Sequence, residues 1–160
     1  MKNKKLIFIT RSALIAAIYV VLTYLTSLIG LDKFAIQCRF SEALCILPFF
    51  TPAAIPGLSI GCIIANLISG SHPLDVVFGS LATLIGAFIA SKIKIKWLVP
   101  LPNIIANTII VPSVIVSVYG AEFAFPLVVL FVFLGEVVSC YVIGMLLLLA
   151  LEKHKSIFSK

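Results

Sequence analysis

Three polar side chains stand inside long apolar stretches of this sequence, where burial of a carboxylate or an amide is costly. Glu136, in the run LGEVVSC, has Ser139 and Cys140 three and four residues later, so all three share one helical face. Asn103 and Asn107 are four residues apart and share a face of another stretch. Carboxylates accept N–H donors, and amides both donate and accept, so this set is suited to holding a polar ligand. Hydrogen bonding between neighbouring helices is the alternative use for each group.

A second polar group lies near the ends of apolar stretches and consists of Arg39, Glu42, Asn66 and Asp75. Arg39 and Glu42 are three residues apart, and from this spacing we expect them to neutralise each other on one helix. Glu42, Asn66 and Asp75 form an alternative, shallower candidate site.

The sequence contains no motif for catalysis or for cofactor binding. There is no GxxxxGK[ST] phosphate loop, no His pair at metal-ligand spacing and no plausible serine triad. The cysteines at positions 38, 45, 62 and 140 form no CxxC pair, and we expect them to pack as small apolar side chains. We therefore predict that the protein is not an enzyme and has no catalytic residue, cofactor or metal ion.

The composition excludes an ordinary water-soluble fold. Of the 160 residues, 62% are hydrophobic and 11% are charged, and the mean hydropathy is +1.24. Soluble domains are roughly 45–50% apolar and about 25% charged, so too few polar residues remain here to cover a surface in water. The net charge of +6 is carried by short clusters beside apolar stretches. Such clusters are typical of membrane orientation and not of a nucleic-acid surface.

Proline, glycine and charge divide the chain into six predicted membrane-spanning helices in a single domain, residues 1–160. The helices are expected at residues 8–30, 39–51, 56–69, 74–91, 98–118 and 123–151. The second and third meet at the TPAAIPG turn and are only ~20 Å long, which is short for a full crossing. They are therefore expected to be tilted, or surrounded by protein instead of lipid. The predicted fold class is an all-α integral membrane protein.

Charge predicts the orientation of these helices. With six spans, ten of the twelve Lys and Arg residues fall on one side, and the positive-inside rule makes that side, with both termini, cytoplasmic. The ten residues are Lys2, Lys4, Lys5, Arg11, Lys92, Lys94, Lys96, Lys153, Lys155 and Lys160. A re-entrant hairpin over residues 39–70 leaves the following helices on the same sides of the membrane as two full crossings do. The distribution of charge therefore does not distinguish a hairpin from two crossings.

Glu136 and Asn107 are predicted to lie at the same depth in the membrane. Counted from the outer ends of their helices, they lie ~18 Å and ~17 Å deep. Because the two helices are expected to be antiparallel neighbours, the two side chains are expected to meet.

Small residues form stripes on several predicted helices. Ala13 and Ala17 make an AxxxA pattern in the first helix, and Gly57 and Gly61 lie four apart in the third. Such stripes let helices approach closely, and alone they indicate packing and not a partner.

Four stretches of the chain carry a resemblance to a known family. They are QCRFSEALCILPFFTPAAIPGLSIGCIIAN (37–66), LDVVFGSLATLIGA (74–87), LPNIIANTIIV (101–111) and LGEVVSC (134–140). With them the chain resembles the QueT family of queuosine-precursor transporters, which are substrate-binding (S) components of energy-coupling-factor (ECF) importers. The resemblance covers nearly the whole chain.

The resemblance implies a multi-pass protein of the bacterial cell membrane that captures a vitamin-like solute from outside. The implied solute is 7-aminomethyl-7-deazaguanine or a close relative. The implied partners are a membrane coupling subunit and two ATPase subunits, with Ala13 and Ala17 packing on the coupling subunit. The loop at residues 31–38 is the implied lid over the site, and the whole body is implied to topple in the membrane.

The deazaguanine chemistry suggests roles for the polar residues. A guanine-type edge offers two adjacent N–H donors that a carboxylate accepts as a fork, and we expect Glu136 in this role. Asn107 is expected to make an amide contact, and Glu42 or Asp75 to bind the ammonium group. Arg39, Asn66 and Asn103 complete the candidate substrate-binding set. Three alternatives stay open: an importer subunit of the same kind for a different flat heterocyclic vitamin, a stand-alone or proton-coupled membrane carrier for another heterocyclic solute, and a structural membrane protein.

Overall fold

A computed structural model describes residues 2–31, 38–120 and 124–153 of the chain, and all regular structure in these ranges is helical. The α-helices are α1 (Lys2–Ile29), α2 (Ala54–Ile68), α3 (Pro73–Ala90), α4 (Leu101–Tyr119), α5 (Phe125–Glu136) and α6 (Gly144–Glu152). Two 3₁₀ segments, η1 (Phe40–Phe49) and η2 (Lys96–Leu98), and one π-helical segment, η3 (Val137–Ile143), complete the order. The predicted all-α class is confirmed. Most of the expected lid, residues 32–37, lies outside the described ranges.

Four helical segments are long and apolar enough to cross a membrane. They are Asn3–Ile29, Pro73–Ala90, Lys96–Val118 and Phe125–Glu152, the last comprising α5, η3 and α6 in continuous succession. The two remaining predicted spans appear as η1 and α2, which are shorter. All six expected segments are therefore helical, and crossing by η1 and α2 stays a prediction.

The chain from Arg39 to Ile68 forms a helical hairpin with a sharp turn. η1 has 10 residues, which at ~2.0 Å per residue in a 3₁₀ helix gives ~20 Å. It ends where the backbone N–H groups of Phe50 and Thr51 both bond to the Leu47 carbonyl, at 2.9 and 3.0 Å. Pro56 then stands in the first turn of α2, where its missing N–H costs no helical hydrogen bond.

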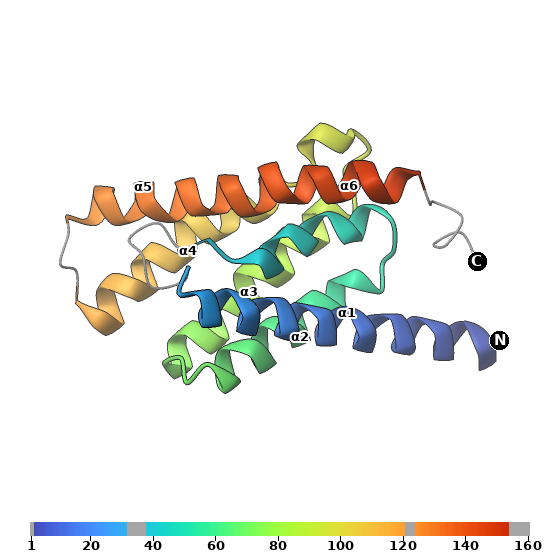
Figure 1. The fold of residues 1–160 in the computed structure, drawn as a ribbon, viewed down its shortest axis with the longest axis horizontal. Coiled ribbons are helices and arrows are strands. Elements are labelled where there is room, and N and C mark those ends of the chain that lie inside the picture. Colours follow the sequence, from blue (N-terminus) through green and yellow to red (C-terminus); the bar gives the residue numbers. More distant parts are fainter. Residues whose placement is uncertain (1, 32–37, 121–123, 154–160) are drawn as a thin grey trace.

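The 3₁₀ helix η1 lies in the middle of the bundle. All residues from Ser41 to Pro48 are buried, and η1 packs against α1, α3, η3 and α6. Figure 1 shows it between α1 and the long α5–α6 helix. Protein therefore surrounds η1, as expected for a segment too short to span lipid, and a carboxylate on it is shielded from lipid.

Glycines bring two helix pairs into close contact. A Cβ added at Gly61 of α2 would lie 2.8 Å from the Cβ of Tyr19 on α1, and one at Gly86 of α3 would lie 2.6 Å from Oδ1 of Asn103 on α4. The small-residue stripe at Gly57 and Gly61 thus serves packing within the chain. Ala13 and Ala17 instead lie exposed on α1.

The start of α1 and the end of α6 lie at the same end of the bundle (Figure 1). An ion pair of 3.0 Å between Lys96 Nζ and Glu152 Oε2 joins η2 to α6 at this end. Termini on one side of the membrane require this arrangement, and the cytoplasmic assignment stays a prediction from charge.

Candidate functional site

A small polar cavity lies at the centre of the helix bundle. Its volume is about 40 Å³, and η1, α2, α3, α4 and α5 supply side chains to its wall. The lining residues are Arg39, Glu42, Cys62, Gly79, Thr83, Asn107, Val111, Val132 and Glu136. Four of the seven predicted substrate-binding residues are therefore brought together in what we call the inner cavity.

Glu42 is held in place from two neighbouring helices. Its side chain is 4% exposed. Tyr19 on α1 donates its hydroxyl to Oε1 at 2.5 Å, and Asn103 on α4 donates Nδ2–H to Oε2 at 2.9 Å. Each carboxylate oxygen can accept a second hydrogen bond. Glu42 is thus oriented by the protein and keeps accepting capacity toward the cavity.

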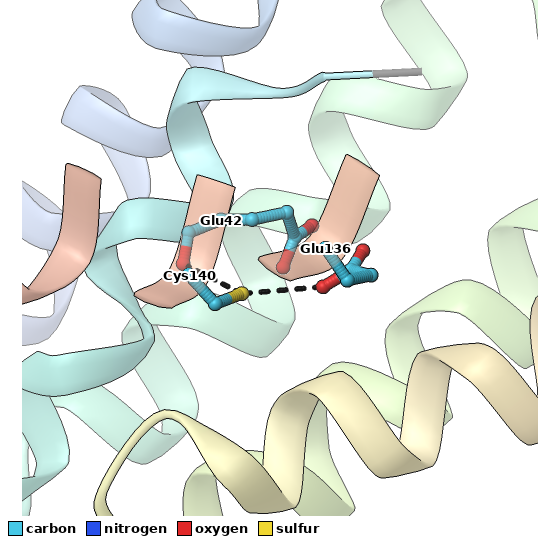
Figure 2. Close-up of side chains that lie close together, drawn as sticks. All are labelled: Glu42, Glu136 and Cys140. Atoms are coloured by element: carbon cyan, nitrogen blue, oxygen red, sulfur yellow. Dashed lines mark hydrogen bonds between the residues drawn. The ribbon is translucent and has the colours of Figure 1, made fainter. Parts of the chain in front are cut away.

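Glu136 ends α5, just before the helix widens into the π-helical η3. The Cys140 thiol on η3 lies 3.2 Å from Oε2 of Glu136 and 3.4 Å from the Glu42 carbonyl, as a donor to either. Carboxylate oxygens of Glu42 and Glu136 and the Cys140 sulfur all lie within 4.8 Å of one another. Figure 2 shows the two carboxyl groups side by side with the sulfur next to them.

Two carboxylates this close repel each other when both are ionised. A ligand that brings N–H donors or a positive charge between them relieves that repulsion. The same three donor atoms are numerous enough to hold a metal ion. The pair of carboxylates is also suited to a ligand with N–H groups or a positive charge.

Asn107 faces the same cavity from α4. It is 4% exposed and lies beside the Glu136 carboxylate. The equal depth predicted for Asn107 and Glu136 is therefore matched by a shared cavity wall.

Asn103, four residues before Asn107, does not line the inner cavity. It is 1% exposed, and besides its bond to Glu42 its Nδ2 lies 3.4 Å from the Cys140 sulfur. Asn103 therefore positions the carboxylate of Glu42 and the thiol of Cys140 without itself lining the cavity.

The residues of the shallower alternative are not gathered around one cavity. Asn66 lines a separate cavity of about 120 Å³, and its Nδ2 donates to the backbone carbonyl of Asp75 at 3.4 Å. Asp75 lies in the first turn of α3 and is in the wall of neither cavity. Glu42 lines the inner cavity, and neither Asn66 nor Asp75 does.

The expected ion pair between Arg39 and Glu42 is not formed. Within the described ranges the ion pair shorter than 4 Å is Lys96–Glu152, although Arg39 and Glu42 line the same cavity. The spacing argument fails because Arg39 precedes η1 with extended backbone angles, φ −115° and ψ 116°. Residues at i and i+3 share a face only when both are helical.

Several residues around the cavity were not predicted from the sequence. Tyr19 orients Glu42, and Cys62 and Thr83 are part of the cavity wall. Cys45 packs in the core as expected for a small apolar residue. Cys140 also lies in the core, but it has polar contacts as well. The position of Cys140 four residues after Glu136 could have indicated that the two side chains meet. Tyr19 could have been noticed because a phenol in an apolar helix needs a hydrogen-bond partner when it is buried.

Comparison with known proteins gives one consistent description. The family model named QueT transporter matches residues 9–153. The chain is similar to a protein described as "Queuosine precursor transporter QueT" from Lactococcus lactis subsp. cremoris (strain MG1363), with 39% identity over 85 residues. The aligned part is 53% of this chain and 50% of that relative, so the match spans about half the length of the relative. No solved structure matches the chain.

Proposed function

This chain belongs to the QueT transporter family, and we propose that it is the subunit that captures a queuosine precursor outside the cell for uptake. Transporters of this family are not enzymes, and the several apolar helices fit a multi-pass protein of the bacterial plasma membrane. The proposed substrate is 7-aminomethyl-7-deazaguanine or a close relative. The relative from Lactococcus, described as a queuosine precursor transporter, supports this choice.

The observation that carries the proposal is the pair of carboxylates, Glu42 and Glu136, in one cavity with Asn107. One carboxylate accepts the two adjacent N–H groups of the guanine-type edge. The second carboxylate accepts from the cationic aminomethyl group, and the Asn107 amide donates to the ring carbonyl. We assign the ammonium to one of these two carboxylates and not to Asp75, because Asp75 lies outside the inner cavity.

Charge balance also favours a cationic solute. With its acids ionised, the inner cavity holds two negative charges, from Glu42 and Glu136, and one positive charge, from Arg39. A solute with one positive charge neutralises this set, whereas a neutral precursor leaves one carboxylate uncompensated in a low-dielectric site.

The size of the cavity requires movement on binding. Sites for drug-sized ligands have volumes of roughly 300–1,000 Å³, and the inner cavity has about 40 Å³. The helices or side chains around it must therefore separate to admit a bicyclic ring. Capture and release are then linked to a change in the shape of the bundle.

If ATP drives uptake, another subunit must hydrolyse it, because this sequence has no phosphate-binding loop. We propose an ECF-type assembly with a membrane coupling subunit and two ATPase subunits. The exposed face of α1 around Ala13 and Ala17 is the proposed contact, since small exposed residues allow another helix to approach closely.

Calorimetric titration of the purified, detergent-solubilised chain tests the substrate. We expect saturable binding of 7-aminomethyl-7-deazaguanine tighter than ~1 µM, which corresponds to ~8 kcal/mol, and no such binding of guanine or thiamine. Equal affinity with and without a metal chelator is expected, because the carboxylates bind the ligand directly. No heat with the deazaguanine would reject the substrate, and equal binding of guanine would reject the role of the ammonium group.

Uptake by reconstituted vesicles separates the importer from a stand-alone carrier. We expect accumulation of the deazaguanine only when the coupling and ATPase subunits and ATP are present. Accumulation driven by the chain alone would establish the alternative of an independent carrier.

A further inference from the structure

A second cavity lies next to the inner cavity and is lined almost entirely by polar residues. Its volume is about 120 Å³, and we call it the outer cavity. Its lining residues come from the last turns of α1 and α2 and from the segments that follow them. In Figure 1 the last turns of both helices lie at the end of the bundle opposite to the chain termini. Its lining residues are Thr23, Thr26, Ser27, Arg39, Asn66, Ser69 and Ser71. Hydroxyl and amide groups of this kind hold water and polar solutes by hydrogen bonds.

Arg39 is the residue that the linings of the two cavities have in common within the described part of the chain. On one side its side chain meets the cavity of Glu42 and Glu136, and on the other side the cavity of hydroxyl groups. Arg39 therefore lies at the boundary between the two cavities.

The backbone at Arg39 is pinned, so that the side chain is the part that can move. The N–H of Arg39 donates to Ser139 Oγ at 3.1 Å, and the N–H of Phe40 donates to Thr26 Oγ1 at 3.2 Å. These bonds tie the start of η1 to both η3 and α1. An arginine side chain has a long, flexible stem and changes rotamer without moving the backbone.

We propose that the outer cavity is the access site for the solute and that the Arg39 side chain closes the passage to the inner cavity. In the closed arrangement Arg39 lines the same cavity as the two acidic groups without forming an ion pair with Glu42, and its positive charge balances part of theirs through space. A cationic solute that arrives through the outer cavity takes over this role and lets Arg39 turn away. This proposal rests on the proposed function for the identity of the solute, but not for the existence of the passage.

Cys62 provides a reporter for the passage that does not depend on the solute. Its side chain lines the inner cavity and is 3% exposed. The experiment measures how fast Cys62 reacts with hydroxyethyl methanethiosulfonate, a small neutral and water-soluble thiol reagent, with peptide mass mapping to locate the modified cysteine. Using a neutral reagent separates the closing of the passage from the attraction of a charged reagent.

Arg39→Ala is expected to raise the rate of Cys62 modification by at least about tenfold, because the inner cavity is then open to the outer one. Arg39→Lys, which keeps length and charge, is expected to change the rate much less. Lys94→Ala is the matched control for removing one positive charge elsewhere. An unchanged rate at Cys62 in Arg39→Ala would overturn the proposal.

Cys45 reports whether a variant is still folded. It lies in the hydrophobic core and lines neither cavity, so it should stay unmodified in every folded variant. If Cys45 reacts in Arg39→Ala, the test passes to Arg39→Gln, which retains more of the side chain. If Cys62 reacts faster in Arg39→Gln than in the unaltered protein while Cys45 stays unmodified, the passage is supported. If Cys62 reacts at the same rate in both proteins, the passage is rejected.

Stopped-flow measurement of the association and dissociation rates of 7-aminomethyl-7-deazaguanine tests whether the passage controls access of the solute to the inner cavity. Arg39→Ala is expected to raise the association and dissociation rates together. If the unaltered chain does not bind this compound, the proposed function fails, while the result at Cys62 still decides the passage.

Discussion

The Tyr19 hydroxyl donates a 2.5 Å hydrogen bond to Oε1 of Glu42, and this contact joins α1 to the 3₁₀ helix at the centre of the bundle. Both residues are buried. The bond therefore places a carboxylate at a defined point of the inner cavity wall, and it links the proposed ligand site to α1, the helix that carries Ala13 and Ala17. If the proposed partner subunit displaced α1, the displacement would be transmitted directly to Glu42.

Tyr19→Phe is expected to weaken both folding and binding. Removing a buried hydrogen bond to a charged group costs about 1.5–3 kcal/mol in unfolding free energy, and Glu42 then loses the group that orients Oε1. Thermal unfolding of the detergent-solubilised protein and ligand titration measure the two effects. Tyr24→Phe is the matched control, because Tyr24 is exposed on the same helix. A Tyr19→Phe protein with unchanged stability and affinity would show that the bond has no role in placing Glu42.

Glu136→Gln is expected to weaken binding of the deazaguanine by about 10- to 150-fold, the equivalent of a lost charge-assisted hydrogen bond of about 1.5–3 kcal/mol. Stability should not fall, because the change also removes one of two neighbouring negative charges. Glu152→Gln is the control on the same long helix, since Glu152 pairs with Lys96 far from the cavity. Wild-type affinity in folded Glu136→Gln would place the binding site elsewhere.

Two glycines of α3 provide a test of how tightly α3 and α4 must pack. A Cβ at Gly86 would lie 2.6 Å from Oδ1 and 2.8 Å from Cα of Asn103, and the second contact is with backbone. Gly86→Ala is therefore expected to lose about 1–3 kcal/mol of unfolding free energy through overpacking. Gly79→Ala meets a single side-chain atom at 3.3 Å and is expected to be tolerated. Equal melting temperatures for the two variants would contradict this packing.

Ala13→Leu with Ala17→Leu is expected to separate ligand capture from transport. Both residues are exposed, so the double variant should fold and bind ligand normally, whereas the bulky side chains keep a partner helix away from α1. Uptake by the reconstituted complex is expected to fall by at least about tenfold, the equivalent of about 1.4 kcal/mol of assembly free energy. Ala150→Leu on α6 is the control, because Ala150 is also exposed. Full uptake by the double variant would exclude this face as the partner contact.

Most helix boundaries were predictable because their causes are local, but α1 begins at Lys2, well before the predicted start at residue 8. The stretch predicted at residues 74–91 is α3, Pro73–Ala90, and it begins at a proline that suits a first helical turn. The turn before α2 follows in the same way from Pro52 and Pro56. The 3₁₀ geometry of η1 and the π-helical η3 were not predicted, because the packing around these segments and not their own residues selects a tighter or wider helix.

That Glu136 and Asn107 lie near each other was predictable from the sequence, but the contacts of individual side chains around them were not. Residue counting brought Glu136 and Asn107 to one level, and both line the inner cavity. The contact of Tyr19 with Glu42 depends on how two helices are rotated against each other, which neither helix encodes alone. The predicted ion pair between Arg39 and Glu42 is wrong because it assumed a helix that begins at Arg39. In the structure the helix begins at Phe40, so Arg39 lies outside it.

Asn103 and Asn107 lie on one face of α4 but have different partners, so their alanine variants should differ in kind. Asn103→Ala removes the donor to Glu42 Oε2 and is expected to lower the unfolding free energy by about 1–3 kcal/mol. Asn107→Ala, in the cavity wall, should be distinguished by its effect on the ligand and weaken deazaguanine binding by about 5- to 30-fold. Thermal unfolding and calorimetry of both variants give the comparison. If Asn103→Ala instead kept full stability and lost as much affinity as Asn107→Ala, Asn103 would itself contact the ligand. The cavity wall as described would then be incomplete on its α4 side.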